Sequence, residues 1–161
     1  MTEPSYLTAE GARRLAEELE NLKGHAREQL AARLRAAIQQ GDLSENADYH
    51  AAKEEQGFLE GRIAELQHIL RNAVIIEHIQ NNPGEVGIGS HVTIQEEDFP
   101  PETYHLVGAN EADPGNNRIS HASPIGSALI GHKVGDKVIA NTPAGTIELK
   151  ILKIEQKQAN N

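Results

Sequence analysis

Two stretches of apolar residues at helical spacing, separated by a short break, constrain the fold of this chain more than any other feature. In the first stretch, apolar residues follow one another at intervals of three or four positions: Leu15, Leu19, Leu22, Ala26, Leu30 and Leu34. In the second stretch most intervals are again three or four positions: Ala47, Ala51, Phe58, Leu59, Ile63, Leu66, Leu70 and Ala73. This period predicts two amphipathic helices, each with an apolar stripe that packs on a partner.

The break between the stripes predicts an antiparallel hairpin. Thr8, with acidic residues after it, suits the start of the first helix, and Gly41 suits a left-handed residue just past its end. Only a few residues then separate the two helices, so they must run in opposite directions. With roughly 30 residues in each helix, the hairpin would be about 40–45 Å long. Its tip, Gly41 to Tyr49, would lie far from the rest of the chain.

The second half of the chain has the pattern of a small α+β domain. Short runs typical of strands, separated by Gly and Pro turns, cover residues 91–94, 103–107, 137–140 and 146–151. One helix interrupts them, with Ser123 as its N-cap, Pro124 as its first residue and Gly131 past its end. We therefore expect residues 1–76 to form the hairpin and residues 80–161 to form a small antiparallel sheet packed by one helix.

The composition excludes several classes of protein. The chain has three Tyr, two Phe and no Trp, which is little large apolar volume for one compact core of 161 residues. Its net charge of −9, acidic in both halves, argues against avid binding of free duplex DNA. No apolar run is long enough to span a membrane, the N-terminus has no signal-peptide pattern, and the absence of Cys fits a cytoplasmic location.

The predicted tip concentrates polar side chains that could carry chemistry: Asp42, Ser44, Glu45, Asn46 and Asp48. On spacing alone the favoured explanation is structural, because Asp42 as an N-cap with Glu45 three residues later matches a capping box. Two or three exposed carboxylates also make a weak metal site unless other ligands complete the shell. Elsewhere the spacing yields no paired His ligands, no phosphate-binding loop and no Ser–His–Asp set.

The tip sequence closely resembles the signature of the bacterial Gre transcript cleavage factors, which act in transcription elongation. The matching segments follow in order along nearly the whole chain: Leu7–Gly11, Gly41–Glu54, Gln56–Phe58, Glu60–Ile63, Glu111–Asp113 and Ser123–Gly126. The resemblance implies an N-terminal coiled-coil hairpin followed by a C-terminal domain folded like the small FKBP-type peptidyl-prolyl isomerases. Both agree with the hairpin and the α+β domain predicted from the residues.

The resemblance also implies a mechanism in which the chain is an accessory factor and not itself an enzyme. As a monomer it would dock on bacterial RNA polymerase through the C-terminal domain and insert the tip through the secondary channel. There it would stimulate the polymerase's own Mg²⁺-dependent cleavage of the nascent RNA at its 3′ end. Asp42 and Glu45 match the family's essential tip acids and would bind a Mg²⁺ held jointly with the polymerase. Ser44 matches the residue that contacts the site beside them, and the chain would have no cofactor of its own.

The sequence departs from the family at two positions near the tip. Many members have an Arg four residues before the tip Asp and a His before the tip Gly, whereas this chain has Ile38 and Gln40. Lys53 retains a basic residue at the matching site on the second helix, and Arg35 is a further candidate for contact with RNA phosphates. Because these two positions lack basic residues, we expect the protein to bind extruded RNA only weakly.

Two other functions remain open at this point. A Gre-like factor could occupy the secondary channel and inhibit the polymerase, although the intact acids Asp42 and Glu45 argue against this. A purely structural or chaperone-like coiled-coil module would have no need of acidic residues gathered at a tip. An assay of transcript length in a stalled elongation complex separates the three.

Overall fold

A computed structural model describes residues 3–156, which divide into two compact units. One unit is the stretch Ala12–Asn72, and the other combines the N-terminal residues through Gly11 with the chain from Ala73 onward. The sequence predicts a hairpin domain over residues 1–76, so the division differs from that prediction at the N-terminus. The reason is a strand pairing and a side-chain contact, described below, that join the N-terminal residues to the second half of the chain.

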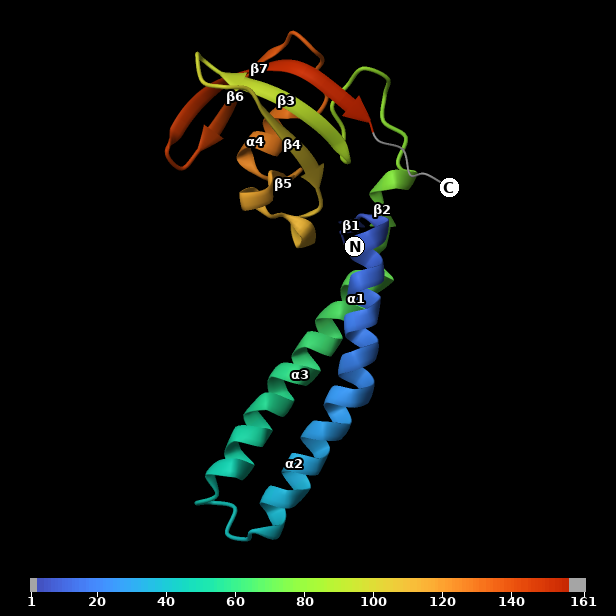
Figure 1. Cartoon of the computed structure of the whole chain (residues 1–161), viewed down its shortest axis with the longest axis vertical. Coiled ribbons are helices and arrows are strands. Elements are labelled where there is room, and N and C mark those ends of the chain that lie inside the picture. Colours follow the sequence, from blue (N-terminus) through green and yellow to red (C-terminus); the bar gives the residue numbers. More distant parts are fainter. Residues whose placement is uncertain (1–2, 157–161) are drawn as a thin grey trace. The chain divides into compact units, whose positions relative to one another are not determined.

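The Ala12–Asn72 unit is an antiparallel helical hairpin, as predicted (Figure 1). Its first arm comprises α1 (Ala9–Asn21), whose first turn belongs to the other unit, a π-helical turn (Leu22–Ala26) and α2 (Arg27–Gln39). Its second arm is α3 (Ala47–Arg71). The apolar residues buried between the arms come from both of them: Leu30, Ala37, Ala52, Ile63, Leu66 and Ile69.

The predicted stripe of the second helix is wrong at three positions. Ala47, Ala51 and Phe58 are exposed, Phe58 at 70%, whereas Ala52 is almost fully buried. The true seam passes from Ala52 through Gln56, which is half-buried, to Ile63. A polar residue in the seam and a large apolar one outside it therefore shifted the predicted stripe onto the neighbouring face.

The first arm is interrupted by a π-helical turn that the apolar spacing does not predict. At its end the N–H of Arg27 donates to the carbonyl of Leu22, five residues earlier, and not only to nearer carbonyls. Gly24 lies within this turn, and glycine favours the regular α-helix less than other residues except proline. The leucine pattern runs through the turn because apolar spacing does not reveal one extra residue per turn.

Ion pairs between the two arms supplement the apolar seam. Arg62 donates from Nε and Nη2 to the two carboxylate oxygens of Glu18, at 2.8 and 3.0 Å. These hydrogen bonds hold the pKa of the Glu18 carboxyl below its ordinary value. Arg27 makes a similar two-pronged contact with Glu60 on α3. The arms are therefore held by charged pairs on their exposed sides as well as by apolar packing.

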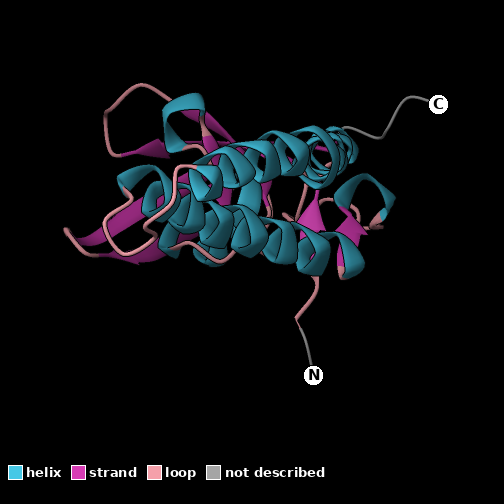
Figure 2. Cartoon of the chain, turned by 90° about the horizontal axis from the view of Figure 1, so that it is seen from below, coloured by secondary structure: helices cyan, strands magenta, loops and turns pink. Residues whose placement is uncertain are grey.

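The second unit is a five-stranded mixed sheet packed on one helix. The strands are β3 (Ser90–Glu96), β4 (Glu102–Val107), β5 (Arg118–Ser120), β6 (Lys137–Thr142) and β7 (Gly145–Gln156), in the order β5-β4-β3-β7-β6. The predicted sheet is antiparallel, but β4 and β5 pair in parallel. The three-residue strand β5 is absent from the prediction because so short a run has no alternation to detect. Every strand of the described residues, drawn in magenta in Figure 2, lies outside the Ala12–Asn72 stretch.

Helix α4 (Pro124–Leu129) lies within the curve of the sheet (Figure 1). Its N-cap is Ser123, whose side chain accepts from the N–H of Gly126 at 3.1 Å, as predicted. Leu129 from this helix is fully buried in a core made mostly by alternate strand residues. The buried apolar members of that core are Val86, Val92, Ile94, Leu106, Ile119, Leu129, Val138, Ala140, Leu149 and Ile151.

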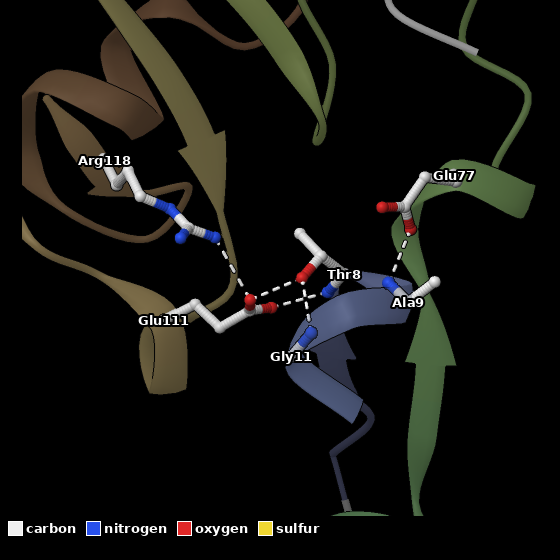
Figure 3. Close-up of polar contacts among 6 residues, drawn as sticks. All are labelled: Thr8, Ala9, Gly11, Glu77, Glu111 and Arg118. Carbon is white, nitrogen blue, oxygen red and sulfur yellow. Dashed lines mark hydrogen bonds and ion pairs between the residues drawn. The ribbon is translucent and has the colours of Figure 1, made fainter. Parts of the chain in front are cut away.

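A short parallel pair of strands brings the N-terminal residues into this unit. Strand β1 (Ser5–Leu7) pairs with β2 (Ala73–Ile75), with Tyr6 opposite Val74. Beyond the strands, the N–H of Ala9 donates to Glu77 Oε2 at 3.0 Å (Figure 3). The chain thus leaves this unit along α1 and re-enters it at β2.

A buried carboxylate fixes the first turn of α1 to the rest of this unit (Figure 3). The Glu111 side chain is 4% exposed and accepts from the N–H and Oγ1 of Thr8 and from Nη2 of Arg118. Thr8 Oγ1 also accepts from the N–H of Gly11 at 2.9 Å, so Thr8 is the predicted N-cap of the first helix. A Cβ at Gly11 would collide with the Glu111 carboxylate, so only glycine permits this close approach.

Among residues 3–156, no helix is both long enough and apolar enough to cross a membrane.

Candidate functional site at the hairpin tip

The tip loop between α2 and α3 reverses the chain through two consecutive left-handed residues. Gly41 has φ +79° and Asp42 has φ +40°. Glycine adopts this region freely and aspartate tolerates it better than most side chains do. The N–H of Glu45 then donates to the carbonyl of Asp42 at 3.2 Å, which closes a turn. Gly41 past the end of the first arm is confirmed as the predicted left-handed cap.

The turn sets the spacing of the two predicted site acids. Asp42 and Glu45 occupy its first and fourth positions, which places their Cα atoms within about 7 Å of each other. Both residues are exposed. The hydroxyl of Ser44 donates to Oδ1 of Asp42 at 3.0 Å. The three predicted residues are thus brought together in one exposed turn.

Neither acid caps a helix, and the capping box expected on spacing is therefore wrong. Helix α3 begins at Ala47, and its N-cap is Asn46, whose Oδ1 accepts from the N–H of Tyr49 at 3.0 Å. Three residues separate Asp42 from Asn46, so Asp42 lies outside the helix altogether. The spacing misled because the sequence offers Asp42, Ser44 and Asn46 as equally good caps.

Asn46 is one of the polar residues that the sequence places at the tip, but its pattern assigned this residue no structural role. It is only 8% exposed, although every other residue from Gly41 to Asp48 is exposed. Its side-chain amide donates to the carbonyl of Ala37 at 2.7 Å and to that of Gly41 at 3.4 Å. The only signal in the sequence is its position, one residue before the first apolar residue of the second stripe.

An open hollow of about 340 Å³ lies at the tip. It is lined by Gln40, Gly41, Asp42, Glu45, Asn46, Ala47 and Asp48. The donor set suits a hard divalent cation, because carboxylate oxygens are the ligands that Mg²⁺ prefers. Within the described residues no group of three or more His, Cys, Asp or Glu side chains could hold a metal ion. The tip acids can therefore contribute to a metal site, but further ligands have to come from elsewhere.

The candidate RNA-contacting residues lie on the exposed surface of the arms. Arg35 is exposed on α2, and Lys53, exposed on α3, donates to Oε1 of Gln56 at 3.2 Å. Two arginines of the first arm are paired across the hairpin, Arg27 with Glu60 and Arg33 with Glu55. The hydrogen bonds between Arg33 and Glu55 raise the pKa of Arg33 and lower the pKa of Glu55. These two arginines stabilise the hairpin and are less suited to binding phosphates than Arg35.

Models of protein families match both parts of the chain. Residues 5–75 match the family described as "Transcription elongation factor, N-terminal", and residues 80–156 match "Transcription elongation factor, GreA/GreB, C-term".

Several curated proteins are similar over nearly the full length. Transcription elongation factor GreA of Chloroflexus aggregans is 51% identical over 156 residues, which cover 96% of this chain and 99% of the relative. GreA of Thermoanaerobacter pseudethanolicus is 48% identical over 157 residues, which cover 97% of this chain and all of the relative. Among solved structures, GreA factor homolog 1 (Gfh1) of Thermus thermophilus is 32% identical with a TM-score of 0.42, covering 95% of this chain and 99% of that one.

Proposed function

Because the chain belongs to the GreA/GreB family of transcription elongation factors, we propose that it acts by stimulating transcript cleavage within bacterial RNA polymerase. It binds the polymerase as an accessory factor and presents the hairpin tip to the catalytic centre through the secondary channel. The hydrolysis itself belongs to the polymerase, so the chain is not an enzyme on its own. The RNA that is cut is the 3′ end of the nascent transcript in a stalled complex.

The observation that carries this proposal is the freedom of the two tip acids. Asp42 and Glu45 stand at the two ends of one exposed turn. The structural task that their spacing suggested, capping α3, is performed by Asn46. Two exposed carboxylates in one turn, neither of which caps a helix, are suited to binding a ligand outside the chain.

The ligand is a Mg²⁺ ion held jointly with the polymerase. Asp42 and Glu45 supply carboxylate oxygens to it, and Ser44 orients Asp42 through its hydroxyl. When bound, such an ion activates water and neutralises the charge that develops on the phosphate. This role explains why the tip lacks a complete set of ligands among the described residues. The other ligands belong to the partner.

The two units divide the work. The sheet unit docks on the polymerase and the hairpin unit delivers the tip. Lys53 and Arg35 lie on the exposed surface of the arms and contact RNA phosphates weakly. The chain acts as a monomer in the cytoplasm and needs no cofactor of its own.

Elongation complexes stalled in a backtracked state test the proposal. The wild-type protein, added with Mg²⁺, should shorten the transcript from its 3′ end. The double variant Asp42→Asn, Glu45→Gln retains the shape of both side chains but loses their charge, and should lower the cleavage rate by roughly 10²-fold or more. It should still compete with the wild type for the polymerase. Glu28→Gln, which removes one exposed charge from the first turn of α2, outside the tip, is the control and should leave cleavage nearly unchanged.

The other outcomes identify the alternatives. Blocked extension without shortening would mean a channel inhibitor, and no change in the transcript would mean a structural module. If the wild type is active and the double variant cleaves equally well, the proposed role of the two acids would be refuted.

A further inference from the structure

We propose that Asn46 is a positioning residue for cleavage, which holds the Asp42–Glu45 turn in its active shape. The inference rests on the proposed function, because it concerns how the same tip is ordered. Asn46 touches neither the reacting phosphate nor the ion in this proposal, and acts only through the backbone of the tip loop.

The Asn46 side chain joins three separate segments of the tip. Its oxygen accepts from the N–H of Tyr49 in the first turn of α3. Its amide nitrogen donates to the carbonyl of Ala37 in the last turn of α2 and to that of Gly41 in the loop. One side chain therefore connects the end of the first arm, the loop and the start of the second arm.

The connection lies in a closely packed part of the hairpin. Ala37 and Ala52, on opposite arms, are 2% and 1% exposed, and Asn46 itself is 8% exposed. A buried hydrogen bond of this kind is geometrically strict, and loss of one partner leaves a buried polar group without compensation. The hydrogen bonds within the turn itself, from Ser44 and Glu45 to Asp42, both involve exposed groups. The exposed turn thus depends on a buried anchor.

Only an amide at position 46 can make all of these contacts. Aspartate is as good an N-cap as asparagine, but it has no N–H to donate and would set a carboxylate against two carbonyl oxygens. Helix α3 would therefore still begin correctly in Asn46→Asp, while the loop from Gly41 to Glu45 would lose its tie to α2. The functional consequence is that Asp42 and Glu45 would no longer be held at the spacing that a shared metal ion requires.

The variant Asn46→Asp separates positioning from folding in the stalled-complex assay. We expect the maximal cleavage rate at saturating protein to fall by about 10- to 100-fold, with no change in the protein concentration that gives half-maximal cleavage. A purely structural defect would do the opposite, because a smaller folded fraction raises that concentration and leaves the maximal rate intact. Helical content by circular dichroism should match the wild type.

Asn72→Asp is the matched control. Asn72 also donates from its amide to a backbone carbonyl, that of His68 at 3.0 Å, but at the other end of α3. The same substitution there should leave the maximal rate unchanged.

A second measurement keeps the inference independent of cleavage. NMR relaxation of the backbone amides of residues 42–45 should show faster local motion in Asn46→Asp than in the wild type or in Asn72→Asp. If the wild type is active, the inference would be overturned by a maximal rate of Asn46→Asp equal to that of the wild type. It would also be overturned if the backbone order of residues 42–45 were the same in both proteins. Absence of cleavage by the wild type would refute the proposed function alone, and the NMR result would still decide the role of Asn46.

Discussion

Thr8 links helix initiation to tertiary structure in a single side chain. Its hydroxyl accepts from the N–H of Gly11 and donates to the buried carboxylate of Glu111. Capping by a local residue and anchoring by a distant one are usually separate tasks. Here they share one hydroxyl group, so a change at this position affects both.

We expect Thr8→Ala to lower the free energy of unfolding by about 1–3 kcal/mol, because it removes a helix cap and one donor to a buried carboxylate. Thr8→Ser retains the hydroxyl and should cost less than about 1 kcal/mol. Urea denaturation followed by circular dichroism measures both. Equal losses for the two variants would show that the methyl group, and not the hydroxyl, matters.

The contact between Glu18 and Arg62 makes part of the hairpin's stability dependent on pH. The Arg62 hydrogen bonds lower the pKa of Glu18 from its ordinary value of 4.5. A carboxyl with a lowered pKa in the folded state stabilises that state fully above its unfolded value. The stabilisation is lost as the pH falls below 4.5 and through the lower folded pKa.

We therefore expect Glu18→Gln to melt at a lower temperature than the wild type at neutral pH and at nearly the same temperature once the pH is below the folded pKa of Glu18. Melting curves over a pH series, at one fixed salt concentration, provide the check. Glu65 is also ion-paired to Arg62 but is more exposed, and Glu65→Gln is the control with a smaller expected effect. A constant difference between Glu18→Gln and the wild type at every pH would contradict the role of ionisation.

At the scale of elements, the two arms of the hairpin show how apolar spacing succeeds and where it fails. The two ends of the first arm were predicted correctly from Thr8 and Gly41, because capping chemistry is local and both residue types favour these positions. The buried face of α3 was not predicted correctly from the sequence, because Phe58 is apolar yet exposed and Gln56 is polar yet half-buried. Only the partner helix decides which face is covered. The π-helical turn likewise leaves the spacing of the leucines almost unchanged.

The exposed position of Phe58 gives the clearest test of the seam. Leu66 is fully buried, so Leu66→Ala should cost about 2–5 kcal/mol in the free energy of unfolding of the hairpin. Phe58→Ala removes a larger side chain, but at 70% exposure its cost should stay within about 0.5 kcal/mol. Chemical denaturation of the two variants compares them directly. A larger loss for Phe58→Ala would restore the stripe predicted from the sequence.

At the tip, too, the sequence predicts local features and not those that depend on packing between the arms. The sequence named the residues Asp42, Ser44 and Glu45 correctly as neighbours, since they lie within four positions of each other. It could not tell which polar residue caps α3, because several candidates for the cap are adjacent. Asn46 is distinguished only by its burial and by its hydrogen bonds to the carbonyls of Ala37 and Gly41, and neither is visible before the arms are packed.

For the whole molecule, the division into units allows the proposed docking and the proposed delivery of the tip to be tested separately. A variant in which Ala12–Asn72 is replaced by a flexible Gly/Ser linker of about ten residues retains β1, the Thr8–Glu111 contact and the complete sheet unit. It should bind the polymerase and compete with the full-length chain without stimulating cleavage. Competition measured in the stalled-complex assay is the readout.

A fragment that starts at residue 80 is the control for this variant. It lacks Thr8 and both strands of the parallel pair, so the buried Glu111 carboxylate loses two of its donors. We expect it to be less stable than the linked form. If the linked form failed to compete while an isolated hairpin succeeded, the assignment of docking to the sheet unit would be wrong.

The sheet unit consists of two segments separated by the hairpin in the sequence, and this also sets the order in which the parts of the chain can fold during synthesis. The hairpin makes contacts between residues that are near in sequence, so it can assemble as soon as α3 has been synthesised. Thr8 has to wait for a carboxylate 103 residues later before its own unit can close. Strand β1 can pair with β2 once Ala73–Ile75 have been synthesised, so the contact of Thr8 with Glu111 forms after that pairing. A nascent chain arrested before Glu111 would already have a complete hairpin and the residues of the parallel pair, but the Thr8 hydroxyl would lack its carboxylate acceptor.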